Sequence, residues 1–252
     1  MSDSTRRFSS RVDNYVKYRP SYPPEVVGLL AAECGLTPGA LVADIGAGTG
    51  LLAELLLKNG NRVFGVEPNR EMRAAGERVL ADYPLYTSID GTAEATTLHD
   101  RSVDIITAGQ AFHWFDREKA RVEFTRILRL GGWVALVWNE RRIDSTPFLA
   151  AYEQLLRTYS SEYELLNHRH VDQQMIAAFF KAGTFRSQTF ENRQIFDFAG
   201  AKGRLLSSSY SPEPGQPTHQ PMLDELAAMF RAHQVDGSVA FEYDTSVYYG
   251  QL

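Results

Sequence analysis

The glycine-rich segment from Asp44 to Gly50 is the first place in the chain where residue types and spacing are suited to holding a ligand. Its sequence is Asp-Ile-Gly-Ala-Gly-Thr-Gly, and it joins the apolar stretch 41–45 to a stretch with helical spacing. Glycines at such a junction allow a tight turn and let the backbone approach a ligand at the start of a helix. We therefore predict a binding site between the first strand and the helix after it.

A carboxylate stands at the end of the next strand. Glu67, in Val-Glu-Pro-Asn, lies 21 positions after Gly46. At that point of such a unit a carboxylate accepts hydrogen bonds from ribose hydroxyls, and both a dinucleotide and an adenosyl cofactor present an adenosine ribose. The glycine spacing favours the adenosyl cofactor, because dinucleotide sites use Gly-x-Gly-x-x-Gly. Here the spacing is Gly-x-Gly-x-Gly, with Leu51 three positions after Gly48.

Strand-like and helix-like segments that must position these residues alternate from residue 22 to about residue 140. Apolar runs predict strands at 41–45, 62–66, 86–89, 103–107 and 133–138. Helical spacing and end signals predict helices at 22–35, 51–58 and 70–82, and a fourth that starts after Asp116 and ends at Gly131-Gly132. Asn69 and Asp116 are expected to cap the helices that follow them. Such alternation predicts a parallel sheet covered on both faces, with its ligand crevice at the carboxyl ends of the strands.

After residue 140 the pattern is less regular. Helical spacing is found at 147–159, 171–182 and 222–233, and strand alternation at 185–198 and 239–249. Residues 207–221 hold four prolines and four serines, which predicts a loop or a hinge. We expect this part of the chain to complete and cap the sheet.

Composition excludes several classes of protein. The chain has 252 residues, 44% of them hydrophobic, and 26 basic and 31 acidic residues give a net charge of −5. It is therefore long and apolar enough to fold around a core, and its acidity argues against nucleic-acid binding. A single cysteine, Cys34, excludes an intrachain disulfide and fits a reducing compartment. His168 and His170 have no third ligand at a suitable spacing, so no metal site is expected.

Targeting and membrane signals are not expected either. The first seven residues are polar and lead into no apolar signal core. The most apolar stretch, 41–57, contains Asp44 and Glu54 and several glycines, so it is not expected to span a membrane. We expect a soluble cytoplasmic protein.

The form Asp-Ile-Gly-x-Gly-x-Gly at 44–50 resembles motif I of the class I S-adenosylmethionine-dependent methyltransferases. Other segments resemble parts of that family in the same order: 91–94 the segment after strand three, 102–115 strand four with its active-site loop, and 128–137 the passage into strand five. The leader 15–23 is similar to that of a small-molecule subgroup, type 11-like and close to the trans-aconitate methyltransferases.

The resemblance implies an α/β fold with a doubly wound, seven-stranded, mostly parallel sheet of the Rossmann-like methyltransferase type and a helical cap. It divides the chain into an N-terminal lid and helix, 1–35, and a methyltransferase domain, 36–252. Within that domain, 36–140 is the cofactor half and 141–252 completes the sheet and covers the acceptor. The first twenty residues are expected to be mobile and to order over the cofactor.

The cofactor implied is S-adenosyl-L-methionine. The glycines would hold its methionine portion, Asp44 the loop or the amino group, and Glu67 the ribose; Tyr18 and Arg19 would lie near the methionine carboxylate. Thr92 stands where many relatives have Asp. The residues expected to bind the cofactor are Tyr18, Arg19, Asp44, Gly46, Ala47, Gly48, Gly50, Glu67, Pro68, Thr92, Ala93, Glu94, Gln110 and Ala111.

The acceptor side is described by fewer residues. Aromatic side chains at 112, 114, 115 and 138 would line a dry chamber and attract a cation. His113 is the candidate general base for a hydroxyl or amine acceptor, and the alternative is that it only packs or caps its loop. If the acceptor is a carboxylate, no base is needed, and Arg141 and Arg142 would orient it; the alternative is that they form a solvated surface pair. The substrate-binding candidates are Trp114, Trp138, Arg141 and Tyr210.

Three other functions stay open at this point. A nicotinamide-dependent oxidoreductase is disfavoured by the glycine spacing, and a non-catalytic cofactor-binding protein would carry the same motifs. Nucleic-acid methylation is disfavoured because strand four lacks the Asn/Asp-Pro-Pro-Tyr/Phe signature and the chain has no basic run. The leading prediction is methyl transfer to a small molecule, with the acceptor, the methylated atom and the oligomeric state left undetermined.

Overall fold

The computed structural model describes residues 12–160, 163, 173–180, 185–208 and 210–252. Its centre is a seven-stranded sheet in the order β3-β2-β1-β4-β5-β7-β6. The strands are β1 Leu41–Ile45, β2 Arg62–Val66, β3 Tyr86–Ile89, β4 Val103–Gly109, β5 Leu128–Arg141, β6 Phe185–Phe196 and β7 Val239–Gly250. The pairs among β1 to β5 are parallel, and β7 is antiparallel to both β5 and β6. The predicted doubly wound, mostly parallel sheet is confirmed.

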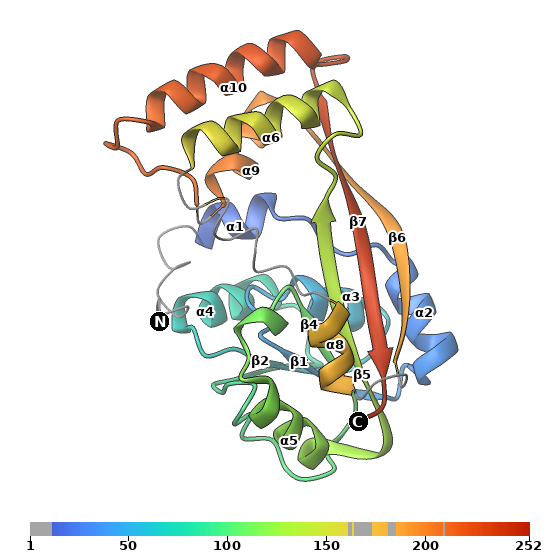
Figure 1. The fold of residues 1–252 in the computed structure, drawn as a ribbon. Helices are drawn as coiled ribbons and strands as arrows, with labels where there is room; N and C mark the ends of the chain where they lie inside the picture. The colour runs from blue at the N-terminus through green and yellow to red at the C-terminus, as the bar shows by residue number, and fades with distance from the viewer. Residues whose placement is uncertain (1–11, 161–162, 164–172, 181–184, 209) are drawn as a thin grey trace.

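The helices lie on both faces of this sheet and at one end of it (Figure 1). They are α1 Val12–Tyr18, α2 Glu25–Cys34, α3 Leu51–Lys58, α4 Arg70–Val79, α5 Arg117–Ile127, α6 Pro147–Tyr159, α8 Gln173–Phe180, α9 Phe198–Leu206 and α10 His219–His233, with a short 3-10 helix, η2, at Phe112–Trp114. Figure 1 shows α6, α9 and α10 grouped at one end as a helical cap, with α1 between this cap and α4.

Burial on both faces explains why the central strands are nearly continuous apolar runs. Alternate residues of β1 enter two different clusters: Val42 packs with α2 and α3, and Ala43 with α5 and α8. A third cluster joins α6, α9 and α10 to the outer part of β7, including Phe241 and Tyr243. The strand β7 therefore connects the parallel part of the sheet to the helical cap.

Local end signals were predicted correctly where polar side chains meet free backbone amides. Asn69 Oδ1 accepts a hydrogen bond from Met72 N, and the Asp116 side chain accepts one from Lys119 N. Gly35 ends α2 with φ of +68°, a left-handed conformation that favours glycine. These caps place the first turns of α4 and α5 directly after β2 and the segment that follows β4.

The Gly131-Gly132 pair corrects the predicted end of the helix that follows Asp116. That helix, α5, ends at Ile127, and both glycines lie inside β5, which starts at Leu128 rather than at residue 133. The pairing with β4 shifts there, from Val103 opposite Leu128 to Ile105 opposite Trp133. A Cβ at Gly132 would lie 2.9 Å from the carbonyl oxygen of Asp104. The glycine is thus required by close approach of two strands, not by a helix end.

Two helices of the cap also differ from the prediction. The strand expected to run to residue 198 ends at Phe196, because Asp197 accepts a hydrogen bond from Gly200 N and caps α9, which was not predicted. Helix α10 begins at His219, three residues before the expected start. The helix predicted at 171–182 is present as α8, and its predicted ends lie outside the described residues.

No helix within the described ranges is both long and apolar enough to cross a membrane.

The β5 glycine yields a test of the fold. We predict that Gly132→Ala lowers the free energy of unfolding by about 1–3 kcal/mol, because the new methyl group overlaps backbone atoms that cannot move freely. Gly28→Ala in α2 is the matched control: nothing lies within 4 Å of its Cβ position. That control should stabilise the protein by about 0.5–1 kcal/mol through helix propensity. Urea unfolding measures both, and equal effects of the two substitutions would contradict the assignment.

Candidate functional site

The carboxyl ends of β1, β2 and β4 form the candidate site, since β1 pairs with both of the others. The glycine loop after β1 is tied to β2 by two bonds: Gly46 N and Ala47 N donate to the carbonyl oxygen of Val66, at 2.8 and 3.1 Å. Gly46 has φ of +69°, and a Cβ there would lie 2.5 Å from the Cβ of Ala111. The loop therefore passes directly against the segment after β4.

Asp44 lies beneath this loop and is almost fully buried, at 1% exposure. Its Oδ1 accepts a hydrogen bond of 2.8 Å from Thr107 Oγ1, on the neighbouring strand β4. Its Oδ2 is buried and has no hydrogen-bond partner within the described part of the chain. Burial raises the pKa of Asp44 to about 7, against the bond from Thr107 and the nearby amide of Ala53, which lower it. The side chain thus has one acceptor atom available for a cationic donor group.

Glu67 lies at the end of β2 and accepts two backbone hydrogen bonds. Its Oε2 receives Gly48 N at 2.9 Å, and its Oε1 receives Asn69 N at 2.8 Å. Burial raises the pKa of Glu67, and the bonds from Asn69 and Gly48 oppose that shift. Each carboxylate oxygen can accept more than one hydrogen bond. The geometry therefore holds the carboxylate beside the glycine loop with acceptor capacity left for hydroxyl groups. Pro68, next in the chain, is exposed.

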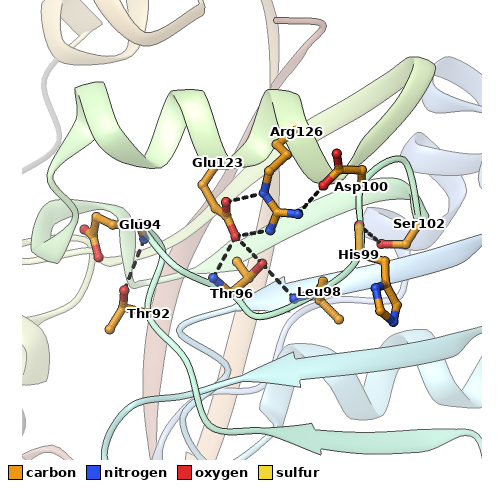
Figure 2. Close-up of polar contacts among 9 residues, drawn as sticks. All are labelled: Thr92, Glu94, Thr96, Leu98, His99, Asp100, Ser102, Glu123 and Arg126. Atoms are coloured by element: carbon orange, nitrogen blue, oxygen red, sulfur yellow. Dashed lines mark hydrogen bonds and ion pairs between the residues drawn. The ribbon is translucent and has the colours of Figure 1, made fainter.

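The segment after β3 joins the site to α5. Glu94 N donates to Thr92 Oγ1 at 3.3 Å (Figure 2), and Glu94 Oε1 accepts from Asp116 N at 2.8 Å. Ala93, between them, is buried in the cluster that contains Phe112. Residues 92–94 are thus connected to the start of α5 just beyond η2.

An ion pair between the buried Glu123 and the partly exposed Arg126 anchors the end of that segment and was not predicted from the sequence. Figure 2 shows Glu123 of α5 between Thr96 and Arg126. It accepts from Thr96 N at 2.8 Å and from Arg126 Nε at 2.8 Å, and Arg126 Nη1 also reaches Asp100 at 2.6 Å. The Arg126 guanidinium and the hydrogen bonds from Thr96 together lower the pKa of Glu123 to about 2. A carboxylate on the buried face of an amphipathic helix was the available sequence signal.

His113 belongs to an aromatic cluster at the ends of β4 and β5. Its ring centroid is 4.5 Å from that of Trp114 and 5.3 Å from that of Trp138. Gln110 precedes the cluster with φ of +55°, and its Nε2 donates to the carbonyl oxygen of Asn139 at 2.8 Å. The structure therefore brings His113, Trp114 and Trp138 together as expected, and it adds Asn139, whose position in an apolar strand was a missed signal.

The remaining predicted residues make their contacts with the cap. Tyr18 packs against the Cα of Gly203 and the ring of Phe196, and Arg19 Nη2 donates to the carbonyl oxygen of Ser207 at 3.1 Å. Arg141 Nη2 pairs with Glu153 at 2.6 Å and contacts Tyr163, whose ring lies 5.1 Å from that of Tyr210. Their roles in ligand binding stay predictions.

Within the described part of the chain, no three His, Cys, Asp or Glu side chains are placed to hold a metal ion. His168 and His170 lie outside that part.

Residues 43–136 match the family model described as a methyltransferase domain. Over these residues the chain is thus similar to methyltransferases. An uncharacterized methyltransferase of Mycobacterium tuberculosis is 40% identical over 139 residues, which is 55% of this chain and 54% of the relative. One from Schizosaccharomyces pombe is 32% identical over 152 residues, 60% of this chain and 59% of the relative. The chain spans somewhat more than half the length of these relatives.

The fold of the methyltransferase domain is shared with solved structures. A structure from Anaeromyxobacter dehalogenans, named as a candidate type II methyltransferase, superposes with a TM-score of 0.72 at 23% identity. The match covers 93% of this chain and 98% of that one. At this identity the likeness concerns the fold, and it includes the β6–β7 region beyond the segment matched by the family model.

Asp44 predicts a pH dependence of stability. Because its folded pKa of about 7 lies above the ordinary value of 3.8, the folded chain keeps a proton that the unfolded chain releases. Its contribution to the free energy of unfolding therefore falls by about 1.4 kcal/mol per pH unit between those values. Urea unfolding from pH 5 to pH 8 should show a smaller decline in Asp44→Asn than in the wild type. The exposed control Asp82→Asn should follow the wild type, and parallel profiles for all three would refute the shift.

The Glu123 network predicts unequal effects of removing its two carboxylates. Glu123→Ala should lower the free energy of unfolding by about 2–3 kcal/mol, because it leaves the Thr96 amide and the Arg126 guanidinium without their acceptor. Asp100→Ala should cost less than about 1 kcal/mol, since Asp100 is exposed. Chemical denaturation distinguishes these values, and a larger loss for Asp100→Ala would contradict the network.

Proposed function

We propose that the chain transfers a methyl group from S-adenosyl-L-methionine to a small-molecule acceptor. The observation that carries this proposal is the unpartnered, buried Oδ2 of Asp44 beneath a glycine loop that is also bonded to Glu67. A buried acceptor without a donor is costly, and an ammonium group would satisfy it. The methyltransferase domain provides the context in which such a pair binds an adenosyl cofactor.

The residues present fit this cofactor. Asp44 would accept from its amino group, Glu67 would accept from the ribose hydroxyls, and Gly48 presents backbone with no side chain in the way. Ala47, Gly50 and the segment 92–94 would contribute backbone around the nucleoside. Tyr18 and Arg19 would lie at the methionine carboxylate, at the junction of α1 and the cap.

In the proposed mechanism, the main task of the protein is to align the acceptor with the methyl group. When bound, the sulfonium supplies a methyl group on a neutral leaving group. Trp114 and Trp138 would exclude water and place the acceptor in line, and such positioning can supply about 7–11 kcal/mol of the barrier. For a hydroxyl or amine acceptor, His113 would take the proton at a ring nitrogen, which typically contributes about 10²–10⁴-fold.

The same proposal includes a small molecule as the binding partner and the cytoplasm as the location. The net charge of −5 favours a small molecule over nucleic acid, and the single cysteine, Cys34, is buried, as a reducing cytoplasm permits.

Calorimetry with S-adenosylhomocysteine tests the cofactor. We expect the wild type to bind it, and Glu67→Ala to weaken binding by about 1–3 kcal/mol, because a charged acceptor of the ribose is lost. Asp82→Ala, an exposed carboxylate on another element, should leave affinity unchanged. Absence of binding by the wild type at high micromolar ligand would overturn the proposal, and unchanged affinity in Glu67→Ala would remove Glu67 from the site.

A further inference from the structure

The helical cap contains a buried cation that has no anionic partner among the residues that the structure describes. Arg204, on α9, is only 5% exposed. Its Nε donates to the hydroxyl of Tyr243 at 3.1 Å, its Nη1 donates to Ser208 Oγ at 3.2 Å, and its Cζ lies 6.0 Å from the centre of the Tyr243 ring. Over the ranges that the structure describes, Arg204 forms no ion pair, and both of these hydrogen bonds go to neutral hydroxyl groups.

Arg141, the other arginine beside this group of tyrosines, has a carboxylate partner that neutralises its charge. The Arg141 side chain is 10% exposed, and its Nη2 lies 2.6 Å from Glu153 Oε2 and 3.2 Å from the hydroxyl of Tyr163. The second oxygen of Glu153 accepts from Arg157 at 3.0 Å. Glu153 is therefore already shared by two arginines, and the positive charge of Arg204 is left without a counterion.

Such an arrangement is costly unless something completes it. A guanidinium stays protonated in proteins, and burying it without a carboxylate costs several kcal/mol. Tyrosine hydroxyls and a ring face recover only part of that cost. The group that pairs best with a planar guanidinium is an oxyanion, a carboxylate or a phosphate, bound through two parallel hydrogen bonds.

The position of Arg204 relates it to the proposed site. Its partner Tyr243, on β7, lies opposite Arg141 of β5. Arg141 is three residues after Trp138, which corresponds to about 10 Å along β5. On the other side, the neighbouring Gly203 packs against Tyr18, so α9 lies directly on α1 (Figure 1). Arg204 thus lies between α1 and β7, and β7 pairs with β5, the strand that carries Trp138.

We propose that Arg204 binds a carboxylate or phosphate group of the acceptor, and that this anion anchors the molecule while another part of it reaches His113. This inference rests on the proposed methyltransferase function. It makes the substrate class an organic anion, and it assigns the anchoring role to Arg204 rather than to Arg141, whose charge Glu153 already balances.

The test is calorimetry at constant ionic strength, with and without S-adenosylhomocysteine, using succinate and inorganic phosphate as probes and succinamide as the uncharged control. We expect saturable binding of at least one anion and none of succinamide. Arg204→Met should weaken anion binding at least about tenfold. Arg231→Met, which removes an exposed arginine of α10, should change it less than twofold. Arg204→Lys keeps the charge but not the fork, and should give an intermediate loss.

The measurements distinguish failure of the Arg204 inference from failure of the proposed function. Wild-type protein that binds S-adenosylhomocysteine but neither anion, or Arg204→Met that binds the anion as the wild type does, overturns the inference and leaves the proposed function standing. Failure to bind S-adenosylhomocysteine overturns the proposed function instead. Retained S-adenosylhomocysteine affinity in Arg204→Met shows that the variant folds; if it is lost, the Arg204→Lys result and the contrast between succinate and succinamide decide.

A labelling experiment tests whether the methylated acceptor is an anion. With methyl-labelled S-adenosylmethionine and a metabolite extract, the wild type should produce label that is retained on an anion exchanger. Label confined to uncharged or cationic products would overturn the inference.

Discussion

Parallel pairing of β1 with β2 on one side and β4 on the other is the constraint on which the rest of the site depends. It brings three chain segments to one edge of the sheet, so that the loop after β1 rests against both Val66 and Ala111. No side chain fits at Gly46, because the backbone passes within van der Waals distance of its neighbour. The ligand-binding geometry is therefore a consequence of strand order, and the glycines permit it rather than create it.

Buried ionisable side chains occupy three places in the fold: beside the glycine loop, after β3 and in the helical cap. Asp44 and Glu67 are carboxylates held beside the glycine loop, Glu123 is a carboxylate that fastens the segment after β3, and Arg204 is a cation in the cap. Glu123 is fully satisfied by its own chain, which suits a structural role. Asp44 and Arg204 are not, and a low-dielectric interior makes such incomplete pairing costly. The chain retains it at the two places where donor and acceptor would bind.

The cofactor half was predictable because its signals are local. Apolar runs between glycines, together with the capping residues Asn69 and Asp116, place each strand and helix close to where the structure has them. The cap was less predictable for an equally physical reason. Helix α9 contains Gly200 and Gly203, which disfavour a helix in isolation, and it exists because Phe196 and Tyr18 pack into the space that those glycines leave. The prediction that Gly131-Gly132 ends a helix was wrong for a similar reason, since a close contact between strands and a helix end both favour glycine.

Residue type and spacing alone determined the class of fold, the glycine loop with its paired carboxylates, and the aromatic loop around His113, because each follows from the order of neighbouring residues along the chain. Tertiary structure decided which charges are balanced. Glu153 and Arg141 are 12 positions apart and pair within the cap, whereas Arg204 bonds to Tyr243 from 39 positions away and, among the described residues, pairs with no carboxylate. Long-range packing sets those distances, so the sequence could name candidates for the acceptor side but could not tell a neutralised arginine from an available one.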